Sequence, residues 1–281
     1  MFAQSLARTA QIFGNRPAVI SSTGQVTWSE FSDQIQSVAK GLRNLGLEPG
    51  DRVAVLAENS VEHLTIMYAV AWAGCVLVPL NTRLSPHEMT QIAKEAGVAA
   101  LAGDSKNKNA FLSLVGAVDQ TLELIDLEGD TGLGAPLGEL VDNDGLDPWK
   151  AEMSDIAALF YTGGTTGRPK GVMVSDGALT VQTLNLVNDL SISSETVYVH
   201  APPIFHLAGA GVSHACSFTG ATHIFPAELS PETFIRTVTD YTVTLVSLIP
   251  TMLADMMEVP NVREAFKAVQ TIVYGAAPIS E

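Results

Sequence analysis

Short apolar runs alternate with helical patterns along nearly the whole chain of 281 residues. Each run is long enough for a buried strand, and the segments between them carry the apolar spacing of helices. Strands that alternate with helices form parallel sheets covered on both faces, so the pattern predicts an α/β fold of layered, mostly parallel sheets. The predicted strands are "RVAVLAE" (52–58), "CVLVPL" (75–80), "VAALAG" (98–103), "LELIDL" (122–127), "DIAALFY" (155–161), "TVYVHA" (196–201), "ATHIF" (221–225), "VTLVSLIP" (243–250) and "TIVYG" (271–275).

Two helix starts are indicated by their capping residues. Ser60 follows one predicted strand and is a plausible N-cap, and Ser85 with Pro86 has the form of an N-cap followed by proline in the first turn. The uncharged stretch 64–80 has the length of a short membrane span, but Gly74 and Pro79 interrupt it. It therefore predicts a buried helix ending at Gly74 and then a buried strand.

Composition excludes several classes of protein. Hydrophobic residues make up 47% of the chain and charged residues 16%, which indicates a packed globular protein. The formal charge is −15 and no Lys/Arg-rich block occurs, so nucleic acid is not expected as a partner. The amino terminus lacks the pattern of a secretory signal. We expect a protein of the cytoplasm, not integral to the membrane.

The cysteines and most histidines show no spacing typical of metal ligands. Cys75 and Cys216 lie in apolar surroundings and are expected to be buried free thiols. Residues 128–150 are rich in Gly, Pro and Asp and predict a surface excursion between elements. The histidines interpreted as packing or surface residues are His63, His87, His200, His214 and His223.

A glycine- and threonine-rich loop, "TGGTTGRPKG" (162–171), follows the predicted strand 155–161. Open α/β sheets place ligands at the carboxyl ends of their strands, where this loop begins. Glycines allow close approach of a ligand, and successive amide groups can form an anion site. Lys170 adds a cation and Thr162 a hydroxyl group. The segment is suited to a polyphosphate, although it lacks the lysine directly after glycine that the P-loop of nucleotide triphosphatases requires.

The loop "YTGGTTGRPKGV" (161–172) resembles the phosphate-binding signature of the AMP-forming adenylating enzymes, which include acyl- and aryl-CoA synthetases. The usual family form has serine where this chain has Gly163, so one hydroxyl donor is missing. Further similar segments are "VTWSEF" (26–31), "AENSVEH" (57–63), "AWAGCVLVPLN" (71–81), "PPIFHLAG" (202–209) and "VYGAAPIS" (273–280). They follow in order along nearly the whole chain.

The resemblance implies that ATP activates a carboxylic acid as an acyl-adenylate, which coenzyme A then converts to a thioester, with pyrophosphate and AMP released. Lys170 would act as a catalytic residue by holding phosphate charge. Thr162 would also act as a catalytic residue and would support Mg²⁺. Phosphate oxygens and water would provide most of the Mg²⁺ ligands. The remaining loop residues implied in cofactor binding are Gly163, Gly164, Thr165, Thr166 and Gly167.

His206 is implied as a further catalytic residue at the border of the carboxylate pocket, which Phe205 before it would also line. Amino-acid-activating members of the family have aspartate at this position, which pairs with the ammonium group of the substrate. Because an unpaired buried ammonium is costly, His206 disfavours an amino-acid substrate and favours a fatty or aryl acid. The small residues Gly209 and Gly211 would lie beside the substrate chain.

The strand end "VYGAAPIS" corresponds to the family segment that contacts adenosine and forms one wall of the acyl pocket. Its implied residues are Gly275 for the pocket, and Ala276, Ala277 and Pro278 for the nucleotide. Small side chains at these positions leave open space.

Family members are about twice as long, so residues 1–281 are expected to be a truncated amino-terminal AMP-binding domain without the C-terminal domain. We expect one subdomain at about 50–190 and a second from 1–50 plus 191–281. The chain is expected to be inactive or nearly so alone, and to self-associate, for example as a homodimer, through exposed apolar surface. Two alternatives stay open: an adenylate-forming enzyme that loads a carrier-protein thiol, and a non-catalytic nucleotide- or acyl-binding module.

Overall fold

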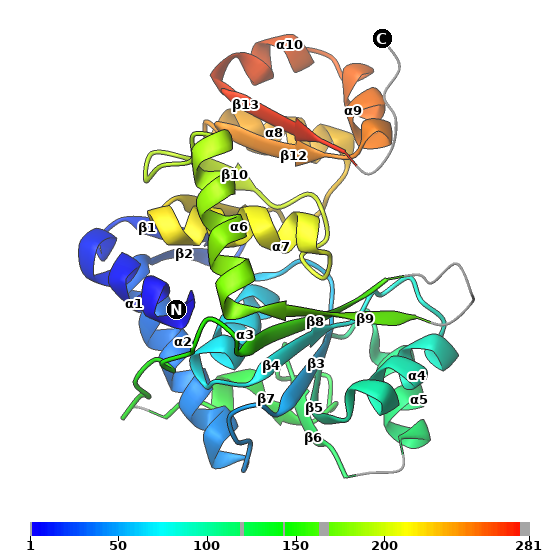
Figure 1. Ribbon diagram of the computed structural model, residues 1–281. Coiled ribbons are helices and arrows are strands. Elements are labelled where there is room, and N and C mark those ends of the chain that lie inside the picture. Colours follow the sequence, from blue (N-terminus) through cyan, green and yellow to red (C-terminus); the bar gives the residue numbers. More distant parts are fainter. Residues whose placement is uncertain (1, 119–120, 143, 163–168, 276–281) are drawn as a thin grey trace. The chain divides into compact units, whose positions relative to one another are not determined.

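The computed structural model describes residues 2–118, 121–142, 144–162 and 169–275 (Figure 1). The chain packs as two compact units. The first unit takes residues 1–8, 31–182 and 205–207, and the second takes residues 9–30, 183–204 and 208–281. The predicted subdomain division near residues 50 and 190 stays a prediction.

The first unit is built on a seven-stranded sheet. Its strands lie in the order β7-β6-β5-β3-β4-β8-β9. All neighbours are parallel except β8 and β9, which are antiparallel. The bounds are β3 (Arg52–Leu56), β4 (Val76–Pro79), β5 (Val98–Gly103), β6 (Glu123–Asp126), β7 (Ala135–Pro136), β8 (Ile156–Thr162) and β9 (Lys170–Ser175). Four of these strands fall within the predicted apolar runs, β8 extends one residue beyond its predicted run, and β7 and β9 were not predicted.

Two helices cover one face of this sheet. In α4 (Pro86–Ala96) the side chains of Met89 and Ile92 are buried in the core cluster that also contains Leu101 of β5. Phe111 of α5 (Lys108–Ala117) is buried in the same cluster. The expected start of α4 is confirmed, because the side chain of Ser85 and that of Glu88 cap each other's backbone N–H groups.

A fully buried helix explains the uncharged stretch 64–80. In α3 (Val61–Trp72) the buried side chains follow one another almost without interruption, and the helix contacts β3 and β4. The ring of Tyr68 also lies 5.5 Å from that of Phe2 and 6.2 Å from that of Phe31. These residues belong to α1 (Phe2–Phe13) and α2 (Trp28–Asn44). The helix is therefore apolar because protein surrounds it, and it starts at the predicted N-cap Ser60.

Among the described residues, no helix is both long and apolar enough to cross a membrane.

The excursion after β6 is organised by one buried carboxylate. Asp126, 1% exposed, accepts hydrogen bonds from the N–H groups of Glu128, Gly129, Thr131 and Gly132 at 2.8–3.1 Å, and from the hydroxyl of Thr131. Burial alone would raise the pKa of Asp126, but these hydrogen bonds outweigh it and lower the pKa. The excursion then adds β7 and a short 3₁₀ helix, η1 (Leu137–Glu139).

The second unit contains a six-stranded sheet in the order β13-β12-β10-β11-β1-β2. Only β1 and β2 are antiparallel. The strands are β1 (Pro17–Ser21), β2 (Gly24–Thr27), β10 (Val197–Val199), β11 (Thr222–Phe225), β12 (Leu245–Leu248) and β13 (Thr271–Tyr274). The described helices from residue 176 onward are α6 (Asp176–Asp189), α7 (Leu207–Thr219), α8 (Pro231–Asp240), α9 (Pro250–Met257), α10 (Val262–Ala265) and the 3₁₀ helix η2 (Phe266–Ala268).

Separate cores cover the two faces of this second sheet. Phe234 of α8 packs with Val246 of β12, and Val212 of α7 packs with Leu245, the preceding residue of β12. Since successive strand residues point to opposite faces, helices lie on both faces of the sheet. The predicted α/β class, with layered and mostly parallel sheets, is confirmed.

A connected group of histidines lies inside the second unit. His200 Nε2 is 2.8 Å from His223 Nδ1, and His223 Nε2 is 2.9 Å from Ser217 Oγ. His200 also stacks on Phe225 with ring centroids 4.0 Å apart. His214 is buried as well. Desolvation lowers the pKa of both His214 and His223 to about 3, so these imidazoles are neutral at pH 7.

The thiols of Cys75 and Cys216 are free and buried, as predicted. Burial raises the pKa of Cys75 to about 12, and raises that of Cys216 as well. Both therefore remain unreactive thiols at neutral pH. Within the described part of the chain, no group of three or more His, Cys, Asp or Glu side chains could hold a metal ion.

Candidate functional site

The glycine-rich segment connects the two strands of a β-hairpin. β8 ends at Thr162 and β9 begins at Lys170, and these two residues are register partners across the antiparallel pair. The structure therefore brings together the two ends of the predicted phosphate loop, a hydroxyl group and a cation, and both residues are exposed. The predicted residues Gly163, Gly164, Thr165, Thr166 and Gly167 lie outside the described residues.

The side chain of Tyr161 packs closely over the glycine beside Lys170. A Cβ atom at Gly171 would lie 2.9 Å from Cζ of Tyr161, its register partner on β8. Tyr161 is partly buried, and desolvation, followed by the charge of Glu95, raises its pKa. The aromatic ring thus occupies the space that a larger residue would need, and Lys170 is directed by a hairpin of fixed register.

Parallel strands beside β8 end at the same edge of the sheet and carry polar residues there. The N–H group of Glu58, after β3, donates to Asp104 Oδ2, after β5, at 2.8 Å. The hydroxyl of Thr82, after β4, donates to Glu58 Oε1 at 2.9 Å. Asp104 Oδ1 accepts from the N–H group of Asn107 at 2.9 Å. This network was not predicted from the sequence, although Glu58 ends one predicted strand and Thr82 and Asp104 lie within two residues of the ends of two others.

His206 stands at the start of α7, next to the buried ring of Phe205. The two rings have centroids 4.7 Å apart and meet edge-on. His206 is exposed to solvent. Desolvation by its surroundings, and then the guanidinium charge of Arg83, lower its pKa. A mainly neutral imidazole at pH 7 can donate one hydrogen bond and accept another.

Gly209, Gly211 and Gly275 belong to the second unit, whereas Thr162, Lys170, Phe205 and His206 belong to the first. Gly209 and Gly211 are buried in α7. A Cβ atom at Gly209 would overlap the carbonyl oxygen of Pro203, so this glycine is required for packing. Gly275 is exposed and has open space at its Cβ position. Ala276, Ala277 and Pro278 lie outside the described residues.

The protein has an α/β architecture, and a network of polar residues lies at the carboxyl ends of the parallel strands of its first sheet. The AMP-binding enzyme model matches residues 6–281, and the chain belongs to this family. It is 31% identical over 275 residues to a feruloyl-CoA synthase of an Amycolatopsis species, covering 97% of this chain and 53% of that protein. It is 33% identical over 291 residues to a long-chain-fatty-acid–CoA ligase of Thermus thermophilus, covering 98% and 53%.

Solved structures show the same architecture. The ATP-bound structure of MatB from Rhodopseudomonas palustris superimposes with a TM-score of 0.84 at 27% identity, covering 99% of this chain and 56% of that one. The chain thus spans about half the length of the curated relatives it matches.

Proposed function

We propose that this chain forms part of an acid–CoA ligase that activates a carboxylic acid with ATP. The products would be an acyl-adenylate and then an acyl-CoA, with pyrophosphate and AMP released. The names of the relatives, a feruloyl-CoA synthase and a long-chain-fatty-acid–CoA ligase, support an aryl or fatty acid as substrate. The observation that carries the proposal is the register pairing of Thr162 with Lys170 at the carboxyl edge of the sheet.

The described residues fit an anionic phosphate group. Lys170 has no side-chain partner in the described part of the chain, is exposed and lies opposite the hydroxyl of Thr162, so both can reach a phosphate oxygen. ATP supplies a good leaving group once its α-phosphate is attacked. We propose that Lys170 neutralises charge on the departing phosphates and that Thr162 orients them and supports Mg²⁺. Gly163, Gly164, Thr165, Thr166 and Gly167 would add amide and hydroxyl donors.

We assign His206 to the carboxylate of the acid. A neutral imidazole can donate a hydrogen bond to a carboxylate oxygen without fixing it in an ion pair, which leaves the oxygen free to react. It offers no fixed negative charge for a substrate ammonium group. Phe205, Gly209, Gly211 and Gly275 would shape the pocket, and Ala276, Ala277 and Pro278 would contact adenosine. Coenzyme A as acceptor, self-association and a cytoplasmic location also stay predictions.

Pyrophosphate exchange with the protein at its full natural length tests this function. We expect acid-dependent exchange of label into ATP with a fatty or an aryl acid from a panel of short, long and aromatic acids. Lys170→Ala should reduce the exchange rate by about a hundredfold, because charge stabilisation of the transition state is lost. Lys106→Ala removes an exposed lysine of the same unit and should leave the rate unchanged.

Exchange that needs no acid, or that only amino acids support, would contradict the proposal. Thioester formation with coenzyme A, compared with a phosphopantetheine carrier protein, then identifies the acceptor. Because the relatives are about twice as long, we also propose that residues 1–281 alone do not catalyse the reaction.

A further inference from the structure

A cavity of about 460 Å³ lies in the first unit at the amino ends of its parallel strands. Arg52, Val76 and Ile156, the first residues of β3, β4 and β8, line it. The cavity therefore lies at the edge of the sheet opposite the one where Thr162 ends β8. It is separate from the proposed nucleotide site and does not depend on the proposed function.

One wall of the cavity is a tryptophan held in place by local packing. The backbone N–H group of Trp149 donates to the backbone carbonyl oxygen of Trp72 at 3.0 Å, and the indole ring of Trp149 covers Gly74. A Cβ atom at Gly74 would lie 2.7 Å from Cδ2 of that indole, and φ of Gly74 is +79°. Trp149 is 41% exposed, so its ring is fixed against the backbone yet accessible.

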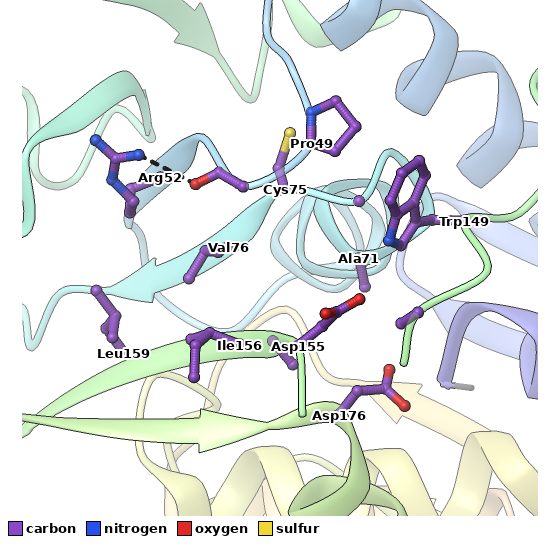
Figure 2. Close-up of a pocket in the computed structure, with 14 residues that line it drawn as sticks. Pro49, Arg52, Ala71, Cys75, Val76, Trp149, Asp155, Ile156, Leu159 and Asp176 are labelled. Carbon is purple, nitrogen blue, oxygen red and sulfur yellow. Dashed lines mark hydrogen bonds between the residues drawn. The ribbon is translucent and has the colours of Figure 1, made fainter. Parts of the chain in front are cut away.

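The charges at the cavity are unevenly placed. Figure 2 shows the carboxylates of Asp155 and Asp176 toward the side where Trp149 lies, and the guanidinium of Arg52 at the other side. Arg52 donates to the carbonyl oxygens of Gly50, Ala96 and Gly97, so its hydrogen-bonding groups are occupied. The side near Trp149 is consequently negative.

Asp155 can neutralise a cation there. It forms none of the ion pairs found among the described residues, and one of its carboxylate oxygens, Oδ2, accepts only the N–H group of Glu152 at 2.9 Å. Asp176 is more constrained, because it is 5% exposed and accepts the N–H group of Phe2 at 3.1 Å. The remaining lining is mostly apolar, with Ala71, Ala157 and Leu159 among its residues.

We propose that this cavity binds a small organic cation with an apolar body. The ammonium group would lie beside the Asp155 carboxylate and the indole face of Trp149, which attract it by charge and by cation–π interaction. The apolar body would cover Ala71 and Leu159. The volume is within the range of small-molecule sites, and a preformed wall reduces the cost of ordering on binding.

Titration with phenethylammonium tests the proposal on the 281-residue chain. Trp28 and Trp72 are 1% and 3% exposed, so a ligand-induced change in fluorescence reports mainly on Trp149. We expect saturable binding, and binding of the neutral isostere 2-phenylethanol at least about fivefold weaker. Asp155→Asn should also weaken phenethylammonium binding about fivefold, because it removes the charge while its amide oxygen can still accept from Glu152.

Glu152→Gln is the matched control. It removes a neighbouring exposed carboxylate that does not line the cavity, and should leave affinity unchanged. Trp149→Leu should weaken binding, measured by calorimetry, by a similar factor to Asp155→Asn. Circular dichroism establishes that each variant folds. A signal that does not saturate, equal binding of 2-phenylethanol, or unchanged affinity in both Asp155→Asn and Trp149→Leu would overturn the proposal.

Discussion

Lowering the pH from 7 to 5 is expected to reduce the free energy of unfolding by about 5 kcal/mol. The cause is a set of fully buried neutral imidazoles. Desolvation lowers the pKa of His63 to about 4, and that of His214 and His223 to about 3. For His63, a carbonyl of Glu58 and the charge of Asp104 offset part of the effect.

The direction of this change in stability with pH follows from proton binding. Below an unfolded pKa of about 6.5 the unfolded chain binds more protons than the folded chain. The contribution of these histidines to the free energy of unfolding is therefore fully present above that pH. It is lost as the pH decreases toward their pKa values in the folded protein, about 4 and 3. Each histidine contributes about 1.4 kcal/mol per pH unit in this window. The total is comparable to the whole stability of many domains.

Urea unfolding followed by circular dichroism between pH 7 and pH 5 measures this loss. His214→Gln should reduce the slope of stability against pH by about a third, since it removes one of the three groups. The control His87→Gln changes an exposed histidine and should leave the slope unaltered. Stability that stays constant from pH 7 to pH 5 would show that the buried imidazoles do not govern acid sensitivity.

Asp126→Ala is expected to lower the free energy of unfolding by about 4 kcal/mol. The substitution leaves the N–H groups of Glu128, Gly129, Thr131 and Gly132, in the loop that follows β6, without their acceptor. Hydrogen bonds to an ionised carboxylate are stronger than neutral ones, and unsatisfied buried donors carry the full cost of desolvation.

Chemical denaturation at pH 7 compares Asp126→Ala with Asp130→Ala. Asp130 is an exposed carboxylate in the same excursion, and its removal should change stability by less than about 0.5 kcal/mol. Equal stability of the two variants would mean that Asp126 does not organise the excursion.

Most of the predicted strands lie in the interior of their sheets, but the edge strand β13, in which Ile272 and Tyr274 are 44% and 56% exposed, was predicted as well. Runs such as "VAALAG" and "VTLVSLIP" have no charged residue, because α4 and α5 pack against β5 and helices lie on both faces of β12. Four strands were missed: β2, β7 and β9 lie at sheet edges, whereas β1 lies between β11 and β2. In β9, Val172 and Met173 are 48% and 71% exposed, and "GQVT" of β2 has little apolar content. Their pairing depends on a neighbouring strand, which local sequence does not reveal.

The site was predictable to the extent that its residues lie in one contiguous motif. Thr162 and Lys170 belong to such a motif, and the hairpin register brings them together. The network of Glu58, Thr82 and Asp104 joins residues from three separate loops, so it becomes apparent only when the strand order is known. The roles assigned to the loop residues 163–167 stay predictions.

Calorimetric titration of the 281-residue chain with ATP in the presence of Mg²⁺ tests the central claim, that the β8–β9 hairpin holds the phosphates of a nucleotide. We expect measurable binding of ATP, weaker binding of AMP, and a loss of ATP affinity of about tenfold or more in Lys170→Ala, with the affinity of Lys106→Ala unchanged. Binding of ATP that Lys170→Ala leaves unaltered, or no ATP binding by any of these proteins, would contradict it.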